Sequence, residues 1–428
     1  MAPFSARFLP LLLLLLPTAL REYLPAASNR RPSDAVGDEL LHPLVLIPGA
    51  SCSELEARLT DAYRPSTQRC GAMKGKGWFG LWQNSSDLSV HRYVACFMEQ
   101  MSLVYHPDAN EFQNLPGVET RVLNFGSSTA FFRNPEQTAL RHELGRLGYD
   151  DGDNLFGAPY DFRHAPPISG QPSPVYARYF RQLAALVEDA SRRRQRKVIL
   201  FGHSFGGMVA LDFARAAPAA WRDRYIKHLV LVAPLPASGI TGSVKSFCSG
   251  THMLYVPTAT SLSLRPMWRS FETAIASFPS PSVFGDDNPL VVTKRRNYTA
   301  RGMADLLADV GAADAVEPFR RRELPRQRYF EPPMVPVTSI TGVGVDTPEQ
   351  LVYWDDDFDA EPEVVYGDGD GAINLVSMLA FDEEMRRQPG QRKQYKSIKV
   401  RGAKHGNFLT EEWSLKLVVQ EILEANRV

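Results

Sequence analysis

Short apolar runs alternate with amphipathic segments through the middle of the chain. Pro43 to Ile47 is continuously apolar and stops at Pro48-Gly49, which indicates a buried strand that leads into a tight turn. From Val175 to Arg194, apolar residues recur at helical spacing and indicate an amphipathic helix. The next three predicted elements are a strand, a helix and a strand, at Val198 to Phe201, Phe205 to Ala217 and Ile226 to Ala233. This succession predicts a parallel sheet with right-handed crossovers.

The same patterns predict further elements on both sides of these four. Strands are expected at Val118 to Phe125, Val337 to Thr341, Val364 to Tyr366 and Tyr395 to Val400, and helices at Pro135 to Gly148 and Glu411 to Ala425. Hydrophobic residues make up 44% of the chain, which suffices for a large core. We therefore expect one α/β domain over residues 42–428, with a mostly parallel sheet and helices on both faces.

The regular pattern fades between about residues 235 and 330, where Pro, Ser and Arg residues cluster. A stretch of this length without clear periodicity is uncommon inside a compact domain and is usually functional. We interpret this stretch as a cap insertion.

The N-terminal segment predicts the cellular localisation of the chain. Phe8 to Leu20 is apolar and uncharged, but it is shorter than a membrane-spanning helix and is interrupted by Pro10 and Pro17. We predict that residues 1–28 are a signal peptide, with an uncleaved signal anchor as the alternative, and that residues 29–41 are a linker. Both alternatives place the body of the chain in the secretory pathway, where it is secreted or lumenal. If the anchor is not cleaved, the protein is also associated with a membrane.

Cysteines and glycosylation sequons fit this route. The four cysteines, Cys52, Cys70, Cys96 and Cys248, suit an oxidising compartment and allow three pairings. Cys70 and Cys96 bracket a short aromatic and polar stretch, so we favour a bond between them, while four reduced thiols remain the alternative. The acceptor sequons at Asn84 and Asn297 predict glycosylation at these two residues.

The charge balance excludes one large class of partners. The chain has 48 Lys and Arg residues against 48 Asp and Glu residues, so its formal net charge is zero. A protein that follows the phosphates of nucleic acid normally carries a basic excess, so we expect no nucleic-acid partner. A local basic run from Arg192 to Lys197 has two interpretations, as a contact for anionic lipid or as a solvated helix C-terminus.

The motif Gly202-His203-Ser204-Phe205-Gly206 lies between a predicted strand and a predicted helix. A nucleophilic serine on such a sharp turn needs flanking glycines, because side chains there would collide with the neighbouring backbone. Ser204 is therefore the predicted nucleophile. The alternative is a Gly-rich turn that serves only close helix packing or phosphate binding.

A serine hydroxyl needs a base, and the base needs a carboxylate to orient it. Of the histidines after Ser204, His405 follows a predicted strand and lies in a loop, where a late catalytic base belongs. The run Gly367-Asp368-Gly369-Asp370-Gly371 follows the strand at Val364 to Tyr366, and we choose Asp370 over Asp368 as the acid. A calcium loop is the alternative for this run, but its ligand spacing does not match.

Two further groups complete the predicted site. Acyl transfer needs N–H donors for the developing oxyanion, and we assign the backbone N–H groups of Ala50 and Phe205 to this role. The cluster Trp78, Phe79 and Trp82 is typical of groups at a membrane–water boundary, with burial in the core as the alternative.

Together these residues resemble the lecithin:cholesterol acyltransferase family, which includes lysosomal phospholipase A2, and the plant acyltransferase-like members in particular. Besides the serine motif, the similar segments are Val45 to Gly49, Leu55 to Ala57, Ala158 to Arg163, Asn297 to Thr299 and Tyr366 to Gly371. The resemblance covers about residues 41–428. It departs from the family at Cys52, where members usually have Gly, and at Ala372, where they usually have Thr.

The resemblance implies an α/β-hydrolase fold with Ser204 as nucleophile, Asp370 as acid and His405 as base. It also implies an oxyanion turn at Ala50 and a lid at about residues 70–96, closed by a disulfide between Cys70 and Cys96. Cys52 and Cys248 are then either free or paired with each other. The family uses no metal or cofactor.

The implied reaction moves an acyl group from a phospholipid at a membrane or lipid surface to the serine, and then to a sterol or another lipid alcohol. A phospholipase A that releases free fatty acid is the second hypothesis, and a non-catalytic lipid-binding protein is the third.

Overall fold

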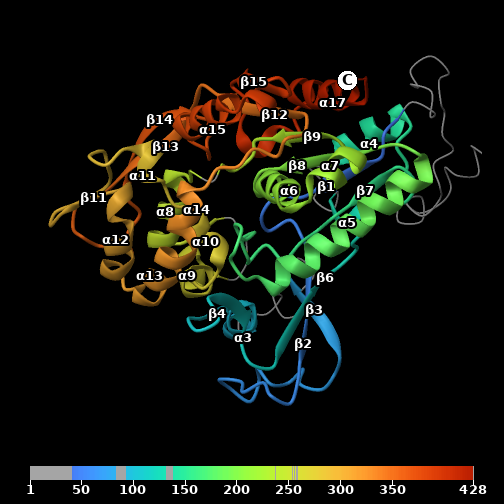
Figure 1. The fold of residues 1–428 in the computed structure, drawn as a ribbon. Coiled ribbons are helices and arrows are strands. Elements are labelled where there is room, and N and C mark those ends of the chain that lie inside the picture. The colour runs from blue at the N-terminus through green and yellow to red at the C-terminus, as the bar shows by residue number, and fades with distance from the viewer. Residues whose placement is uncertain are drawn as a thin grey trace, which may run out of the picture.

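Six parallel strands form the centre of the molecule, in the order β15-β12-β9-β8-β1-β7 (Figure 1). The structure is a computed structural model that describes residues 41–82, 93–131, 138–236, 238–252, 254, 256 and 259–427. The six strands are β1 (Leu44–Ile47), β7 (Leu155–Gly157), β8 (Val198–His203), β9 (Ile226–Val232), β12 (Val337–Val343) and β15 (Tyr395–Arg401). All neighbouring pairs are parallel, as the sequence predicts.

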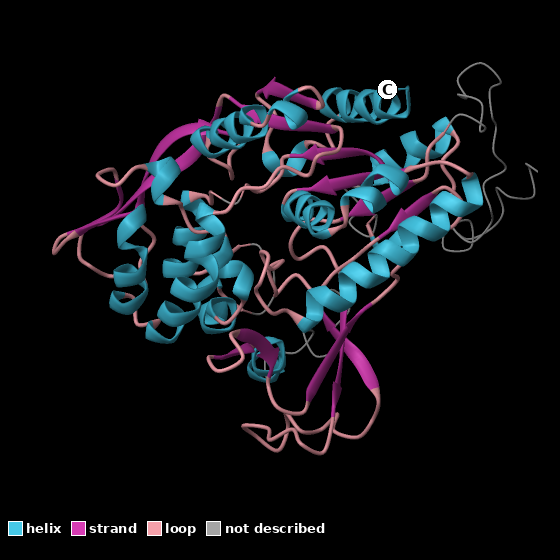
Figure 2. Cartoon of the chain, in the orientation of Figure 1, coloured by secondary structure: helices cyan, strands magenta, loops and turns pink. Residues whose placement is uncertain are grey.

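Helices cover both faces of this sheet (Figure 2). They are α4 (Thr138–Leu147), α5 (Pro174–Arg194), α6 (Phe205–Ala216), α7 (Ala219–Tyr225), α15 (Leu375–Arg387), α16 (Pro389–Arg392) and α17 (Glu412–Arg427). In β8, Val198 and Leu200 pack in the cluster that contains α5 and α6, whereas Ile199 and Phe201 pack in the cluster that contains α4 and α17. Successive side chains of a strand face opposite ways, so burial on both faces requires the continuous apolar run from Val198 to Phe201.

A small antiparallel sheet and a hairpin lie beside the central sheet. Its strand order is β3-β2-β6, from β3 (Trp78–Trp82), β2 (Leu55–Leu59) and β6 (Val118–Val122), and the hairpin joins β4 (Leu103–His106) to β5 (Glu111–Asn114). A disulfide joins Cys70 to Cys96, which lies on α3 (Val94–Met101), so the predicted pairing is confirmed.

The segment from residue 235 to 330 is built mainly from short helices, although its sequence shows little periodicity. These are α8 (Thr241–Ser249), α9 (Ser261–Arg269), α10 (Glu272–Ala276), α11 (Pro281–Phe284), α12 (Met303–Asp309), α13 (Val316–Pro318) and α14 (Leu324–Arg328). None of these seven exceeds nine residues, so each offers at most about two turns of pattern. Two strands, β10 (Pro289–Thr293) and β11 (Asn297–Thr299), pair with β13 (Val345–Tyr353) and β14 (Glu363–Gly369) in a second sheet ordered β11-β10-β13-β14.

Buried polar contacts hold this segment together and connect it to the rest of the molecule. Glu272 on α10 accepts hydrogen bonds from Arg322 Nε at 2.5 Å and from the backbone N–H of Ala165 at 3.0 Å. Arg326 on α14 lies 3.3 Å from Asp212 on α6, measured from Nη1 to Oδ2. The side chains of Glu272, Arg322 and Arg326 are at most 2% exposed. The Arg326–Asp212 pair therefore joins α14 to α6, the helix that follows the predicted nucleophile, and the Ala165 contact joins α10 to the loop between β7 and α5.

Among the described residues, no helix combines the length and the apolar character needed to cross a membrane.

Candidate active site

The backbone turns sharply at Ser204, between the end of β8 and the start of α6. Ser204 has φ 55° and ψ −126°, a conformation that a residue with a side chain adopts only when its surroundings impose it. A Cβ on Gly206 would lie 2.3 Å from the carbonyl oxygen of Pro48, and one on Gly202 would lie 2.6 Å from that of Gly206. Only glycine fits at these two positions, which explains why the motif surrounds the serine with glycines.

Ser204, His405 and Asp370 form a continuous chain of hydrogen bonds. His405 Nε2 lies 2.9 Å from Ser204 Oγ, and His405 Nδ1 lies 2.9 Å from Asp370 Oδ2. A carboxylate only accepts, so Nδ1 carries the proton and Nε2 is left to accept one from the serine. The three residues predicted from separate parts of the sequence therefore lie in the order that nucleophilic catalysis needs.

The loops that carry the acid and the base support each other. The Asp370 side chain is fully buried, and its Oδ1 accepts from the backbone N–H groups of Ala372 at 3.0 Å and Ile373 at 2.7 Å. The backbone N–H of His405 donates to the carbonyl oxygen of Asp370 at 2.8 Å. The contact at Ala372 is made by its backbone, so the departure from the family residue at this position leaves the acid's partner in place. Asp368, the rejected alternative, is exposed and accepts from the N–H of Gly344.

The two histidines near the serine have opposite pKa shifts. Burial lowers the pKa of His405, but the charge of Asp370 and its hydrogen bond outweigh this effect, so the pKa lies above the ordinary value. Burial, together with the charge of the nearby His405, lowers the pKa of His203 to about 4. The ring centroids lie 5.7 Å apart, so His203 presents a neutral ring beside the base at neutral pH.

The turn after β1 lies against Ser204, the predicted nucleophile. A Cβ on Gly49 would lie 3.3 Å from Ser204 Cβ, which places the adjoining Ala50 next to the serine. Phe205 is the first residue of α6, and the first N–H groups of a helix have no partner within the helix. Both N–H groups assigned to the oxyanion therefore belong to segments beside Ser204, and their role remains a proposal.

Trp82 supports this turn, a role that the sequence did not indicate. Its Nε1–H donates to the carbonyl oxygen of Ser51 at 2.7 Å, and its ring packs on Phe97 and Phe162. Ser51 has a left-handed φ of 62°, so this hydrogen bond holds an unusual backbone conformation. The small antiparallel sheet is thereby connected directly to the predicted oxyanion turn.

The predicted lipid contact of the aromatic cluster needs correction at two residues. Phe79 and Trp82 are 7% and 6% exposed because they face the core from β3. Trp78 is half-buried between the guanidinium groups of Arg58 and Arg121. In this arrangement, Trp78 is the member of the cluster that reaches the surface.

The two remaining cysteines and the predicted glycosylation site at Asn297 lie outside the chain of hydrogen bonds at Ser204. Cys52 and Cys248 are free, so they do not pair with each other. Burial raises the pKa of Cys52 to about 11, so its thiol stays protonated at neutral pH. Asn297 is exposed on β11 and accessible for glycosylation, whereas Asn84 and residues 1–40 lie outside the described residues.

Two supporting residues escaped the sequence analysis. Thr347 on β13 is fully buried, and its Oγ1 accepts from the N–H of Gly371 beside the acid. Gly342 on β12 lies so close to both catalytic loops that a Cβ there would lie 2.0 Å from the carbonyl oxygen of Ala403 and 2.8 Å from Asp370 Cβ. Neither residue belongs to a motif, so only the folded arrangement identifies them.

The sequence and the fold were compared with those of known proteins. The sequence profile of the family described as lecithin:cholesterol acyltransferase matches residues 78–324. The chain is 43% identical to "Lecithin-cholesterol acyltransferase-like 1" from Oryza sativa subsp. japonica over 91% of this chain and 88% of the relative. It is 29% identical to "Lysosomal phospholipase A and acyltransferase" from Rattus norvegicus over 89% of this chain and 90% of the relative.

A solved structure shares the fold at low sequence identity. The protein in "The crystal structure of Tle4-Tli4 complex" superposes with a TM-score of 0.54 and 10% identity, over 90% of this chain and 99% of that chain. Together with the mostly parallel sheet and the helices on its faces, this likeness confirms the α/β-hydrolase fold.

Proposed function

The chain belongs to the lecithin:cholesterol acyltransferase family, and from that membership we propose that it transfers a fatty acyl group from a phospholipid to a sterol or another lipid alcohol. It is an enzyme that acts on lipids, as an acyltransferase or a phospholipase. The observation that carries the proposed mechanism is the hydrogen-bond chain from Ser204 through His405 to Asp370.

In the first half of the reaction, Ser204 Oγ attacks the carbonyl carbon of the phospholipid ester while His405 Nε2 takes the hydroxyl proton. The tetrahedral oxyanion accepts hydrogen bonds from the N–H groups of Ala50 and Phe205. The ester bond then breaks, and His405 gives its proton to the leaving oxygen of the lysophospholipid. Asp370 holds the imidazole in place and stabilises its positive charge.

In the second half, a hydroxyl group attacks the acyl-enzyme. His405 takes the proton of that hydroxyl, the new ester forms, and the proton returns to Ser204 as the product leaves. A sterol or another lipid alcohol gives an ester, and water gives free fatty acid. Hydrolysis is the second candidate, because the rat relative carries both activities in its name.

Residues around the site support contact with a lipid surface and a route through the secretory pathway. Trp78 offers an aromatic side chain at the surface of the small sheet, in the predicted lid at residues 70–96, where contact with a lipid surface is expected. The Cys70–Cys96 disulfide supports a secretory route, since such bonds persist in oxidising compartments. Glycosylation at Asn84 and Asn297 and a signal peptide at residues 1–28 complete this part of the proposal.

Product analysis tests the proposed reaction. The protein and its Ser204→Ala variant are supplied with phosphatidylcholine labelled in an acyl chain, with and without a sterol. Labelled steryl ester from the wild type supports the acyltransferase, and free fatty acid alone supports the phospholipase. Equal product from the wild type and Ser204→Ala would overturn the mechanism.

A further inference from the structure

A large basic cavity lies at the end of the central sheet opposite to the serine. Its volume is about 1070 Å³. It is lined by residues that precede or begin five strands: His42 before β1, Lys197 before β8, Lys227 in β9, Pro336 before β12 and Gln394 before β15. Ser204 follows the other end of β8, a strand of six residues and roughly 20 Å. The cavity is therefore separate from the catalytic site.

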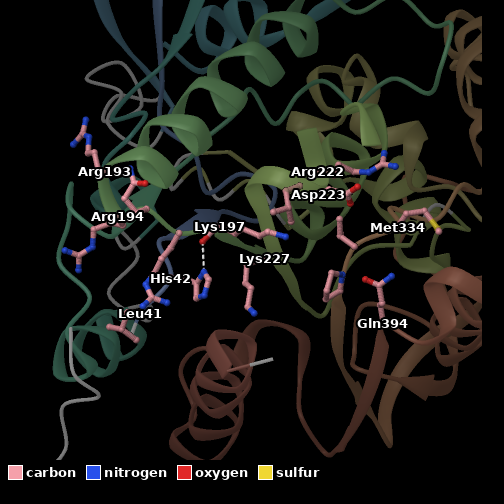
Figure 3. Close-up of a pocket in the computed structure, with 15 residues that line it drawn as sticks. Leu41, His42, Arg193, Arg194, Lys197, Arg222, Asp223, Lys227, Met334 and Gln394 are labelled. Atoms are coloured by element: carbon pink, nitrogen blue, oxygen red, sulfur yellow. Dashed lines mark hydrogen bonds between the residues drawn. The ribbon is translucent and has the colours of Figure 1, made fainter. Parts of the chain in front are cut away.

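Cations dominate the lining of this cavity. Among the 15 described residues that line it, six are Arg or Lys and one, Asp223, is acidic. The six are Arg193, Arg194, Arg196, Lys197, Arg222 and Lys227. Figure 3 shows Lys197, Lys227 and His42 gathered at the centre, with Arg193 and Arg194 to one side.

Helix capping accounts for part of this cluster only. Arg193 pairs with Asp189 in the last turns of α5, Arg194 pairs with Asp153, and Arg222 donates to the carbonyl oxygens that end α6. Cations at helix C-termini are common. Lys197 and Lys227 lie just after the C-caps of α5 and α7, at the starts of the paired strands β8 and β9, where Val198 is opposite Ile226.

The pKa values of Lys227 and His42 are lowered in this cavity. Burial lowers the pKa of Lys227, and the charge of Lys197 lowers it further. Burial also lowers the pKa of His42, and the charges of Lys227, Arg196 and Lys197 contribute in the same direction. The hydrogen bond between His42 and the carbonyl oxygen of Lys197 raises this pKa, but by less. Burial is the larger cause of both shifts, and the cations that line the cavity add to it, in a chain whose formal net charge is zero.

Guanidinium groups bind phosphate through paired N–H donors, and ammonium groups bind it as point charges. Three of the six cations already contact carboxylates or backbone carbonyls, but a cavity of about 1070 Å³ is still larger than one phosphate group fills. We propose that this cavity binds a compound that carries two or more phosphate groups, either as a soluble anion or as the headgroup of a membrane lipid. The site is built by the sheet and its adjoining helices, so it does not depend on the chemistry at Ser204.

Calorimetry of the full chain with inorganic tripolyphosphate tests the proposal. At low ionic strength we expect binding that weakens strongly as salt is raised to about 0.15 M, since screening then limits charge attraction to about 8 Å. The variant Lys197→Gln/Lys227→Gln should bind at least about tenfold more weakly. Ser204→Ala should bind as the wild type does, which separates this proposal from the catalytic one.

A matched control removes the same charge from elsewhere on α5. Arg178 and Arg181 are exposed on this helix, and Arg181 lies 12 positions, about 18 Å, before Arg193. The variant Arg178→Gln/Arg181→Gln should bind tripolyphosphate like the wild type. Thermal unfolding of each variant reports its folding, and the single change Lys197→Gln, at an exposed side chain, repeats the test with little risk to the fold. Absence of binding, or equal affinity of the wild type and the cavity variants, overturns the proposal.

Vesicles distinguish the two sources of phosphate. Phosphatidylcholine vesicles with and without a bis-phosphorylated phosphatidylinositol are mixed with the wild type and the cavity double variant. Binding that needs the phosphorylated lipid, is lost in the double variant and is displaced by tripolyphosphate assigns the site to a lipid headgroup. Tripolyphosphate binding without such vesicle binding assigns it to a soluble anion. Vesicle binding that the double variant retains, with no effect of tripolyphosphate, shows that the cavity is not the lipid contact.

Discussion

The two ring nitrogens of His405 have different partners, and this difference decides which proton each one handles. Nδ1 faces the buried Asp370, whereas Nε2 faces Ser204 Oγ. An amide at position 370 would keep the size of the side chain but could present an N–H to the ring, which would favour the wrong tautomer. The acid therefore contributes through its charge and its ability to accept.

The choice between two nearby acids gives a direct comparison. Asp370→Asn should lower kcat by about 10³- to 10⁴-fold, because the imidazole loses its correct tautomer. Asp368→Asn should change kcat less than about threefold, because Asp368 is exposed and contacts neither Ser204 nor His405 in the structure. Steady-state rates of ester cleavage measure both, and a larger loss in Asp368→Asn would move the acid to position 368.

The raised pKa of His405 predicts the pH dependence of the reaction. Only the neutral imidazole accepts the serine proton, so kcat/KM should fall as pH decreases through the pKa of His405. Because Asp370 raises that pKa, the midpoint should lie above about 6.5, the ordinary value for histidine. His228→Gln, which changes a histidine remote from the triad in β9, should keep the same midpoint. A midpoint below 6.5 in the wild type would contradict the contribution assigned to Asp370.

The turn from β8 to α6 depends on close backbone contact. Gly206→Ala should destabilise the protein by about 1–3 kcal/mol or more, because the new Cβ would meet the carbonyl oxygens of Pro48 and Ile47 at 2.3 and 2.4 Å. Gly145→Ala is the control within α4, where a Cβ meets nothing within 4 Å. That change should stabilise the protein by about 0.5–1 kcal/mol through helix propensity. Chemical denaturation measures both, and equal effects would show that the turn tolerates a side chain.

Some helices and strands could be predicted from the sequence, and others could not. The strands and helices around Ser204 could be predicted because each is buried on a regular pattern, and the chain order of serine, acid and base then follows. By contrast, β13 escaped prediction because Val345–Tyr353 contains a proline and several polar residues, and Pro348 lies at an irregularity in its pairing with β14. The support that Trp82 gives to Ser51 joins two elements 31 residues apart, and no local pattern shows such a contact.

Across the whole molecule, the two ends of the central sheet carry different chemistry. The carboxyl ends of the strands lead to the loops of the triad, which is the usual place for an active site in a parallel sheet. The amino ends carry the basic cavity. The net charge is zero, but the charges are unevenly distributed over the molecule. A zero net charge therefore does not exclude a local site for an anionic ligand.

The buried ion pair of Glu272 and Arg322 holds together two parts of the segment at residues 235–330, and its loss should destabilise the protein. Glu272→Ala leaves the buried Arg322 without its carboxylate, so it should lower the free energy of unfolding by about 3–5 kcal/mol. Glu412→Ala breaks a fully exposed pair with Lys416 and should leave the free energy of unfolding nearly unchanged. Denaturant titration compares the two variants, and a small effect of Glu272→Ala would show that the buried Arg322 does not depend on this carboxylate.

The central claim is that His405 activates Ser204 as the nucleophile, and covalent labelling tests it most directly. A long-chain alkyl fluorophosphonate reacts with activated serines, and peptide mass spectrometry locates the adduct. We predict a single adduct on Ser204 in the wild type, no adduct in Ser204→Ala and strongly slowed labelling in His405→Ala. Labelling at another residue, or undiminished labelling of either variant, would contradict the account.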